Sequence, residues 1–118
     1  TTLVNVKVRA FIDSLDRASL LINDRLKSPV RCVFENDEIK ISCATTIGRI
    51  RDEIEAQLSG DGVEMGFNNK YLMDALRASE SDEVRIELNG PVSPMKIYPP
   101  QGEDFLFLVL PVRLKNEI

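Results

Sequence analysis

The 118-residue chain has no histidine and no tryptophan, and only two cysteines, two tyrosines and five phenylalanines. Without histidine, the commonest general base and a leading metal ligand are missing, which disfavours triad-type hydrolysis and a zinc site. The acidic stretches "SESDE" and "RDEIE" have no nucleophile, base and orienting group near them, and the glycines fall in turns rather than in a phosphate-binding loop. We therefore expect no enzymatic activity, no cofactor and no metal.

Long apolar runs and an excess of positive charge are also missing. The longest apolar run, "FLFLVL", has six residues, far fewer than the roughly 18 that a membrane helix requires, and the N-terminus shows no secretory signal pattern. The net charge of −4 gives the whole chain no electrostatic footprint for nucleic acid, so any contact with DNA must be local. We expect no membrane association, and a cytoplasmic location.

The chain length and the composition, with 43% hydrophobic and 29% charged residues, fit one globular domain over residues 1–118. Cys32 and Cys43 lie in two alternating runs joined by the turn-like "ENDE". Pairing Phe34 with Ile39 places the two cysteines on diagonal positions, with Cα atoms roughly 7–8 Å apart, a poor geometry for a disulfide. Reduced cysteines in the core are the expectation.

The chain contains an internal repeat. Two amphipathic helices are predicted, at residues 9–23 and 69–81. A shift of 60 residues aligns Phe11 with Tyr71, and it also aligns the triplet Arg-Ala-Ser in the first helix with the same triplet in the second helix. Asn68 is a plausible N-cap for the second helix, whereas the first has no comparable cap. Repeat one spans about residues 1–59, repeat two about 60–114, and a tail 115–118.

Each repeat is predicted to contain a strand, a helix and three strands, which defines an α+β fold. The predicted strands are residues 3–8, 30–34, 38–43, 48–58, 63–67, 83–88, 94–98 and 105–111. Two helices cover only one face of an antiparallel sheet of about eight strands, so the other face should meet water. The last strand is apolar on both sides. Either its outer side receives a partner, or the strand is central and a loop covers it.

The first helix carries a second apolar anomaly. Leu20 lies among charged residues, and with Leu21 beside it forms an apolar spot that the core of the domain cannot use. A neighbouring domain or subunit would cover this spot, although single exposed leucines are common. The outward faces of the two helices carry the basic residues Arg9, Arg17, Lys70 and Arg77. They could contact phosphates, although acidic residues share the surface and solvated helix faces often look like this.

The stretches "FIDSLDRASLL", "GFNNKYLMDAL", "VRIELNGPVSPM" and "FLVLPVRL" resemble, in this order, the C-terminal domain of the bacterial DNA polymerase III beta subunit, the sliding clamp. The resemblance implies a DNA-clamp fold, with two helices packed on one face of the sheet. It also implies a replication processivity factor that forms part of a homodimeric ring around duplex DNA. Its partners would be the replicative polymerase, the clamp loader and repair proteins, which bind through short linear motifs.

The resemblance also assigns residues. It places a hydrophobic peptide-binding groove at Leu26, Asn68, Tyr71, Val92, Pro94, Leu108, Val109, Leu110, Pro111, Val112, Arg113 and Leu114. It places Leu20 and Leu21 at the contact with the second clamp subunit. Arg9, Arg17, Lys70 and Arg77 would face DNA, held topologically and with weak direct contacts.

Some features depart from the family pattern. A clamp subunit has three such domains and this chain holds one, so half of the groove should be missing. The residues "KNEI" extend beyond the usual end, and Pro94 stands where a small polar residue is common. The residues themselves leave two other functions open: a small α+β domain with a ligand pocket beside its apolar last strand, and an oligomerisation domain.

Overall fold

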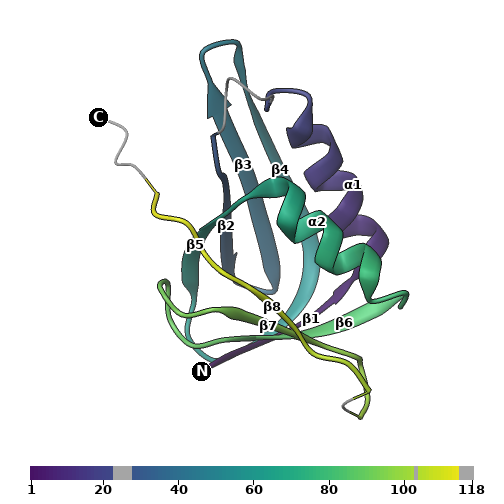
Figure 1. Ribbon diagram of the computed structural model, residues 1–118. Helices are drawn as coiled ribbons and strands as arrows, with labels where there is room; N and C mark the ends of the chain where they lie inside the picture. Colours follow the sequence, from purple (N-terminus) through teal and green to yellow (C-terminus); the bar gives the residue numbers. More distant parts are fainter. Residues whose placement is uncertain (23–27, 103, 115–118) are drawn as a thin grey trace.

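The computed structural model describes residues 1–22, 28–102 and 104–114. Two helices pack on one side of a long curled sheet (Figure 1). The first half of the chain contains β1 (Thr2–Lys7), α1 (Val8–Ser19), β2 (Val30–Glu35), β3 (Glu38–Thr45) and β4 (Gly48–Ser59). The second half contains β5 (Val63–Phe67), α2 (Asn69–Ala78), β6 (Glu83–Leu88), β7 (Met95–Tyr98) and β8 (Phe107–Val109). The same order of elements occurs twice, as the repeat predicted.

The eight strands form one antiparallel sheet in the order β5-β2-β3-β4-β1-β6-β7-β8. The long strand β4 changes partner along its length: residues Gly48–Glu55 pair with β3, whereas Ala56–Ser59 pair with β1. The two outer strands, β5 and β8, are brought together by the segment that follows β8. In this segment the Val112 amide donates a hydrogen bond of 2.8 Å to the Gly66 carbonyl.

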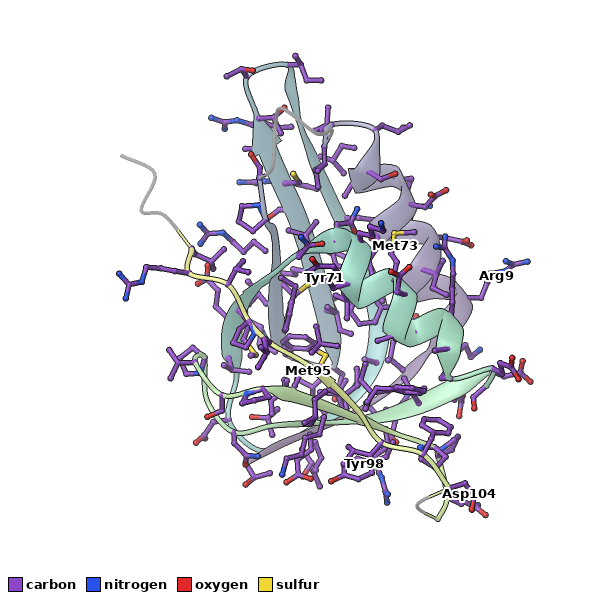
Figure 2. All side chains as sticks on the ribbon, viewed as in Figure 1. Arg9, Tyr71, Met73, Met95, Tyr98 and Asp104 are labelled. Atoms are coloured by element: carbon purple, nitrogen blue, oxygen red, sulfur yellow. The ribbon has the colours of Figure 1, made fainter. Side chains whose placement is uncertain are left out.

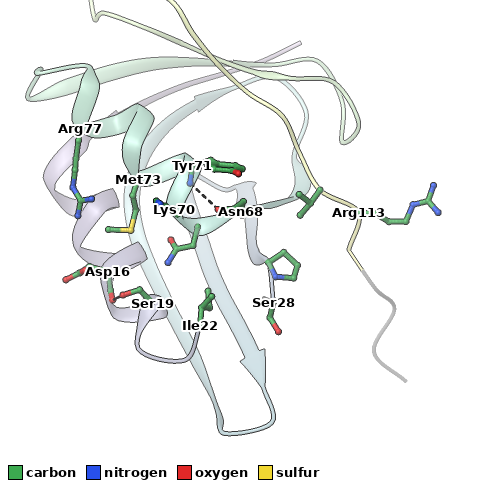
Figure 3. Close-up of a pocket in the computed structure, with 13 residues that line it drawn as sticks. Asp16, Ser19, Ile22, Ser28, Asn68, Lys70, Tyr71, Met73, Arg77 and Arg113 are labelled. Atoms are coloured by element: carbon green, nitrogen blue, oxygen red, sulfur yellow. Dashed lines mark hydrogen bonds between the residues drawn. The ribbon is translucent and has the colours of Figure 1, made fainter. Parts of the chain in front are cut away.

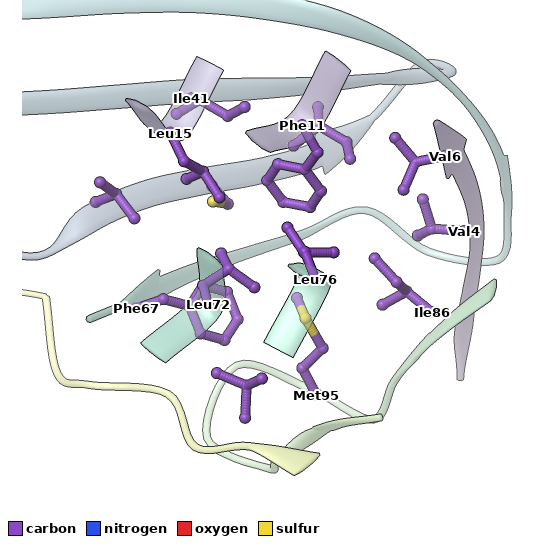
Figure 4. Packing of buried hydrophobic residues seen from close by; sticks show 14 of the residues in the cluster. Val4, Val6, Phe11, Leu15, Ile41, Phe67, Leu72, Leu76, Ile86 and Met95 are labelled. Atoms are coloured by element: carbon purple, nitrogen blue, oxygen red, sulfur yellow. The ribbon is translucent and has the colours of Figure 1, made fainter. Parts of the chain in front are cut away.

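The core lies between the helices and the inner face of the sheet (Figure 4). Phe11 and Leu15 of α1 and Leu72 and Leu76 of α2 are fully buried there. Alternate strand residues complete the core, for example Val4, Val6, Ile41, Ile86 and Met95. Because residues between these positions are more exposed, the opposite face of the sheet meets solvent, as the alternating pattern predicted.

The helix boundaries differ slightly from the prediction. Val8 begins α1 instead of ending β1, and α1 ends at Ser19 because the next three amide groups bond to carbonyls three residues back rather than four. Helix α2 ends at Ala78, and Glu80 has a φ of 50°, in the left-handed region, which stops the helix before the predicted residue 81. No helix among the described residues is long and apolar enough to cross a membrane.

The last strand is shorter than predicted and lies at the edge of the sheet. Only Phe107–Val109 pair with β7, so the prediction of a strand over 105–111 was too long, and the alternative of a central strand is wrong. Val109 is buried, whereas Leu106, Leu108 and Leu110 point to the other side and are at least half exposed. One side therefore belongs to the core, and the apolar outer side has no cover among the described residues.

The cysteine prediction is confirmed. Strand β2 pairs with β3 so that Phe34 lies opposite Ile39 and Cys32 opposite Ile41. Both cysteines are buried thiols. Burial raises the pKa of the Cys32 thiol to about 12, which keeps it protonated and unreactive at neutral pH.

Candidate functional site

A small pocket, here called the tail pocket, lies beside the segment that follows β8. Its volume is about 240 Å³, and it is lined by Glu64, Met65, Gly66, Pro91, Val92, Pro111, Val112, Arg113 and Leu114. The wall depends on a close approach of two segments, because a Cβ atom added at Gly66 would lie only 2.5 Å from Cδ2 of Leu114. The absence of a side chain at Gly66 lets the tail lie against β5.

A larger pocket, the helix pocket, lies on the other side of the same segment, between the C-terminal end of α1 and the N-terminal half of α2 (Figure 3). Its volume is about 750 Å³, and its lining includes Asn68, Tyr71, Met73, Val112 and Arg113. Tyr71 extends from the first turn of α2 toward the C-terminal segment (Figures 2 and 3). It is 64% exposed, so much of the residue is available to a partner.

Asn68 fixes the start of α2 as predicted. Its side-chain oxygen accepts a hydrogen bond of 3.2 Å from the Tyr71 amide, which satisfies one of the unpaired donors at the helix N-terminus. This bond holds the first turn of α2, which carries Tyr71. Helix α1 has no side-chain cap, also as predicted.

The predicted groove residues therefore separate into groups. Those in the tail pocket are Val92, Pro111, Val112, Arg113 and Leu114, and those in the helix pocket are Asn68, Tyr71, Val112 and Arg113. Leu108 and Leu110 are exposed but line neither pocket, and Pro94 is half-buried outside both. Leu26 lies outside the described residues. Val109 differs from the expectation because its side chain is buried in the core and offers no surface to a ligand.

The sequence did not indicate four residues of the tail pocket: Glu64, Met65, Gly66 and Pro91. Gly66 belongs to "GFN" and Pro91 precedes Val92, so both were adjacent to residues already selected. Their role depends on a contact between residues 66 and 112, which local periodicity cannot show. Among the described residues, no cluster of acidic residues and cysteines has the arrangement of a metal site.

The four predicted basic residues lie in different environments. Lys70 and Arg77 are exposed and line the helix pocket. Arg9 points away from α2 (Figure 2) and lines a separate surface depression with Glu80, Asp82 and Glu83. The local field at Arg9 is therefore less positive than the sequence suggested.

Arg17 is engaged by a carboxylate. Its guanidinium donates to Asp52 of β4, with Nε 3.1 Å from Oδ2 and a second contact through Nη2. The hydrogen bond from Arg17 holds the pKa of the Asp52 carboxyl below its ordinary value, and the same bond raises the pKa of Arg17. This pairing neutralises part of the positive charge on the outer face of α1.

The apolar spot at the end of α1 is divided between surface and interior. Leu20 is 78% exposed, whereas Leu21 is half-buried and packs beside Gly48 at the start of β4. Ile47, at the tip of the β3–β4 hairpin, is also exposed. An apolar surface therefore exists at this end of the molecule, with Leu20 as its most exposed side chain.

Two repeats that share one curled sheet, with both helices on its inner side, define the class of the protein as a DNA-clamp fold. Residues 1–113 match the family described as "DNA polymerase III beta subunit, C-terminal domain", and the chain belongs to this family.

Individual relatives agree with this assignment. The "Beta sliding clamp" of Staphylococcus aureus is 35% identical over 106 residues, which cover 87% of this chain and 28% of that protein. The crystal structure of the DNA polymerase sliding clamp from Bacillus subtilis is similar with a TM-score of 0.90 and 32% identity, covering 97% of this chain and 31% of that one. A putative DNA polymerase III beta subunit from Eubacterium rectale gives a TM-score of 0.89 at 31% identity, covering 94% and 30%. This chain therefore spans less than a third of the length of these relatives.

Proposed function

We propose that this chain acts as the C-terminal domain of a sliding clamp, a non-catalytic processivity factor of DNA replication. In a complete ring it would help to encircle duplex DNA, in the compartment that holds the chromosome, and would dock the polymerase, the clamp loader and repair proteins. Membership of the beta-subunit family supports this proposal. The apolar surface around the tail pocket is the single observation that carries the peptide-binding part of it.

The docking surface would be half of a peptide groove. Val92 is 86% exposed and lines the tail pocket, whose volume is about 240 Å³, and Leu110, directly before the pocket residue Pro111, is 69% exposed. Tyr71 offers an exposed aromatic face on the other side of the C-terminal segment. Exposed apolar side chains beside a preformed pocket are typical of sites that receive a short hydrophobic motif.

The isolated chain should bind such a motif weakly. Two apolar anchors that are each half-buried contribute about 1.5–3 kcal/mol together. After the cost of association is subtracted, the dissociation constant for a motif peptide is expected to be roughly millimolar. A second wall, supplied by another domain of a longer clamp chain, would strengthen binding.

The remaining proposed contacts belong to the ring. Leu20, with Leu21 beneath it, would meet the second clamp subunit, since Leu20 is exposed and apolar at the end of α1. Lys70 and Arg77 are the residues best placed for weak contacts with DNA, because they are exposed and have no ion-pair partner among the described residues. Arg9 and Arg17 would contribute less, because acidic residues lie near both.

A fluorescence-anisotropy titration tests the peptide site. A labelled peptide containing glutamine-leucine-serine-leucine-phenylalanine should bind, and a scrambled peptide should not. Val92→Asp should weaken binding at least fivefold, because it places a charge beside the tail pocket. Ile47→Asp is the matched control, since Ile47 is an exposed branched side chain at the hairpin tip, and it should leave binding unchanged. Equal binding of both peptides would contradict the proposal.

A further inference from the structure

The loop between β6 and β7 contains an asparagine that is followed directly by a glycine. This loop, residues 89–94, has the sequence "NGPVSP", and its residues Pro91 and Val92 line the tail pocket. Asn89 is exposed and lies beyond the last residue of β6, where no strand pairing holds it. The proposed peptide site uses Val92 and gives no role to Asn89.

The surroundings of Gly90 let its backbone nitrogen reach the asparagine side chain. In such a reaction the amide nitrogen of the following residue attacks Cγ of the asparagine, and a side chain on that residue hinders the approach, whereas glycine has none. A Cβ atom added at Gly90 would meet no atom within 4 Å, so the space around this residue is open. Among the described residues, no group accepts a hydrogen bond from the Gly90 amide. The nitrogen is therefore free to attack.

The hydroxyl group of Thr1 activates the asparagine side chain. It donates a hydrogen bond of 2.9 Å to Oδ1 of Asn89. This bond draws electron density from Cγ and stabilises the negative charge that develops on Oδ1 during the attack, as donors do in an oxyanion hole. Thr2 is buried, and its own hydroxyl donates to the Asp61 carbonyl at 2.5 Å, so the backbone next to Thr1 is held in place.

We propose that Asn89 is a site of spontaneous deamidation, promoted by the Thr1 hydroxyl, and that the reaction alters the wall of the tail pocket. The Gly90 nitrogen forms a bond to Cγ of Asn89 and loses its proton, while the bond from Cγ to the side-chain nitrogen breaks. Ammonia leaves, and a five-membered succinimide ring remains. Water then opens the ring, giving aspartate when the bond from nitrogen to Cγ breaks and isoaspartate when the bond from nitrogen to the main-chain carbonyl carbon breaks.

Both products change the loop beside the tail pocket. Each places a carboxylate at residue 89, and isoaspartate also adds a methylene group to the backbone directly before Gly90 and Pro91. Because Pro91 and Val92 line the tail pocket, isoaspartate moves part of its wall and weakens the binding of an apolar motif. This effect on binding rests on the proposed function, whereas the reaction at Asn89 does not.

Peptide mapping by mass spectrometry tests the reaction. The 118-residue chain is incubated for several days at mildly alkaline pH in heavy-oxygen water, then digested with trypsin beside a sample taken at the start. The peptide of residues 86–96 contains Asn89, and the peptide of residues 32–40 contains Asn36, an exposed turn residue followed by Asp37. Asn89 should lose its amide at least tenfold faster than Asn36, take up heavy oxygen and give mainly isoaspartate. Equal rates at the two asparagines overturn the proposal.

A pair of threonine variants tests the role of Thr1. Thr1→Val keeps the branched shape and removes the hydroxyl that donates to Asn89, so deamidation at Asn89 should slow at least twofold. Thr46→Val is the matched control, because it makes the same chemical change at an exposed position in the β3–β4 turn, and the rate at Asn89 should stay unchanged. An unchanged rate in Thr1→Val, or an equal slowing in both variants, overturns the assignment of Thr1 as the activating group.

Peptide binding by the separated forms tests the effect on the tail pocket. Anion-exchange chromatography separates the unmodified chain from the deamidated one, because deamidation adds a negative charge. In fluorescence anisotropy with the labelled peptide glutamine-leucine-serine-leucine-phenylalanine, the isoaspartate form should bind at least threefold more weakly than the unmodified chain. Equal binding by the two forms overturns the link between Asn89 and the pocket. If the unmodified chain does not bind, the proposed function fails and this link fails with it, whereas the reaction at Asn89 is decided by the peptide map alone.

Discussion

The amide nitrogen of Val112 lies 2.8 Å from the carbonyl oxygen of Gly66, and this hydrogen bond joins the segment that follows β8 to β5, the strand at the other end of the sheet order. It holds the C-terminal segment across β5, where Leu114 packs against the bare backbone of Gly66. Gly66 and Val112 both line the tail pocket, and the exposed side chain of Val92 forms another part of its lining.

Replacing Gly66 with alanine should displace the tail. The added methyl group would lie 2.5 Å from Leu114 Cδ2 and 3.0 Å from the Val112 carbonyl oxygen, so the segment must move. We expect faster amide exchange at Val112 and a loss of about 1–2 kcal/mol in the free energy of unfolding. Gly48→Ala is the control, since its added methyl group meets only an ordinary contact of 3.4 Å. Unchanged exchange at Val112 in Gly66→Ala would argue against this role of the glycine.

Replacing Asn68 with alanine should destabilise α2. The variant loses the hydrogen bond from the Tyr71 amide to the Asn68 side chain, and we expect the free energy of unfolding to fall by about 1 kcal/mol in urea titrations. Asn68→Asp keeps a capping acceptor and should remain near wild-type stability. If both variants lose the same stability, the effect does not come from the cap.

The Arg17–Asp52 pair should make stability depend on pH in the acidic range. The hydrogen bond from Arg17 lowers the pKa of Asp52 in the folded state. The stability that this pair contributes is therefore present above the unfolded pKa of about 3.9 and is lost as the pH falls through the lower folded pKa. The difference in unfolding free energy between wild type and Asp52→Asn should therefore shrink between about pH 5 and pH 2. An Arg17→Gln background lacks this hydrogen bond, so the effect of Asp52→Asn on the unfolding free energy should change less over this pH range. A difference that stays constant over this range in the wild-type background would contradict the assignment.

Leu20 and Leu21 should respond differently to replacement by lysine. Leu20 is 78% exposed, so Leu20→Lys should change the free energy of unfolding by less than about 0.5 kcal/mol. Leu21 is half-buried beside Gly48, and Leu21→Lys should cost about 1–2 kcal/mol. Thermal unfolding of the two single variants measures both effects. A large loss in Leu20→Lys would mean that this residue supports the fold rather than an interface.

Local patterns in the sequence predicted most of the elements. Alternation predicted the pairing of Cys32 with Ile41, and the position of Asn68 before an amphipathic segment predicted the cap of α2. The internal repeat predicted that the order of elements occurs twice, and the resemblance predicted the family. These features depend on residues that are close in the chain or on similarity between segments.

Contacts between distant segments could not be predicted in this way. The bond between Gly66 and Val112 and the pair Arg17–Asp52 each depend on how the sheet curls and where the helices pack, and periodicity contains no information on either. The apolar run at residues 105–110 suggested a longer strand than β8. Its inward residues are buried or half-buried and its outward residues exposed, but only three residues pair with β7. Apolar pattern alone therefore overestimated the length of the strand.

An amide chemical-shift titration of the isotope-labelled chain with the peptide glutamine-leucine-serine-leucine-phenylalanine tests the central proposal most directly. The account predicts selective, saturable shifts at Tyr71, Val92 and residues 110–114, with a dissociation constant of roughly 1 mM and no such shifts with a scrambled peptide. Shifts that are absent up to several millimolar, or that are confined to residues away from both pockets, would contradict the assignment of the peptide site to the C-terminal segment.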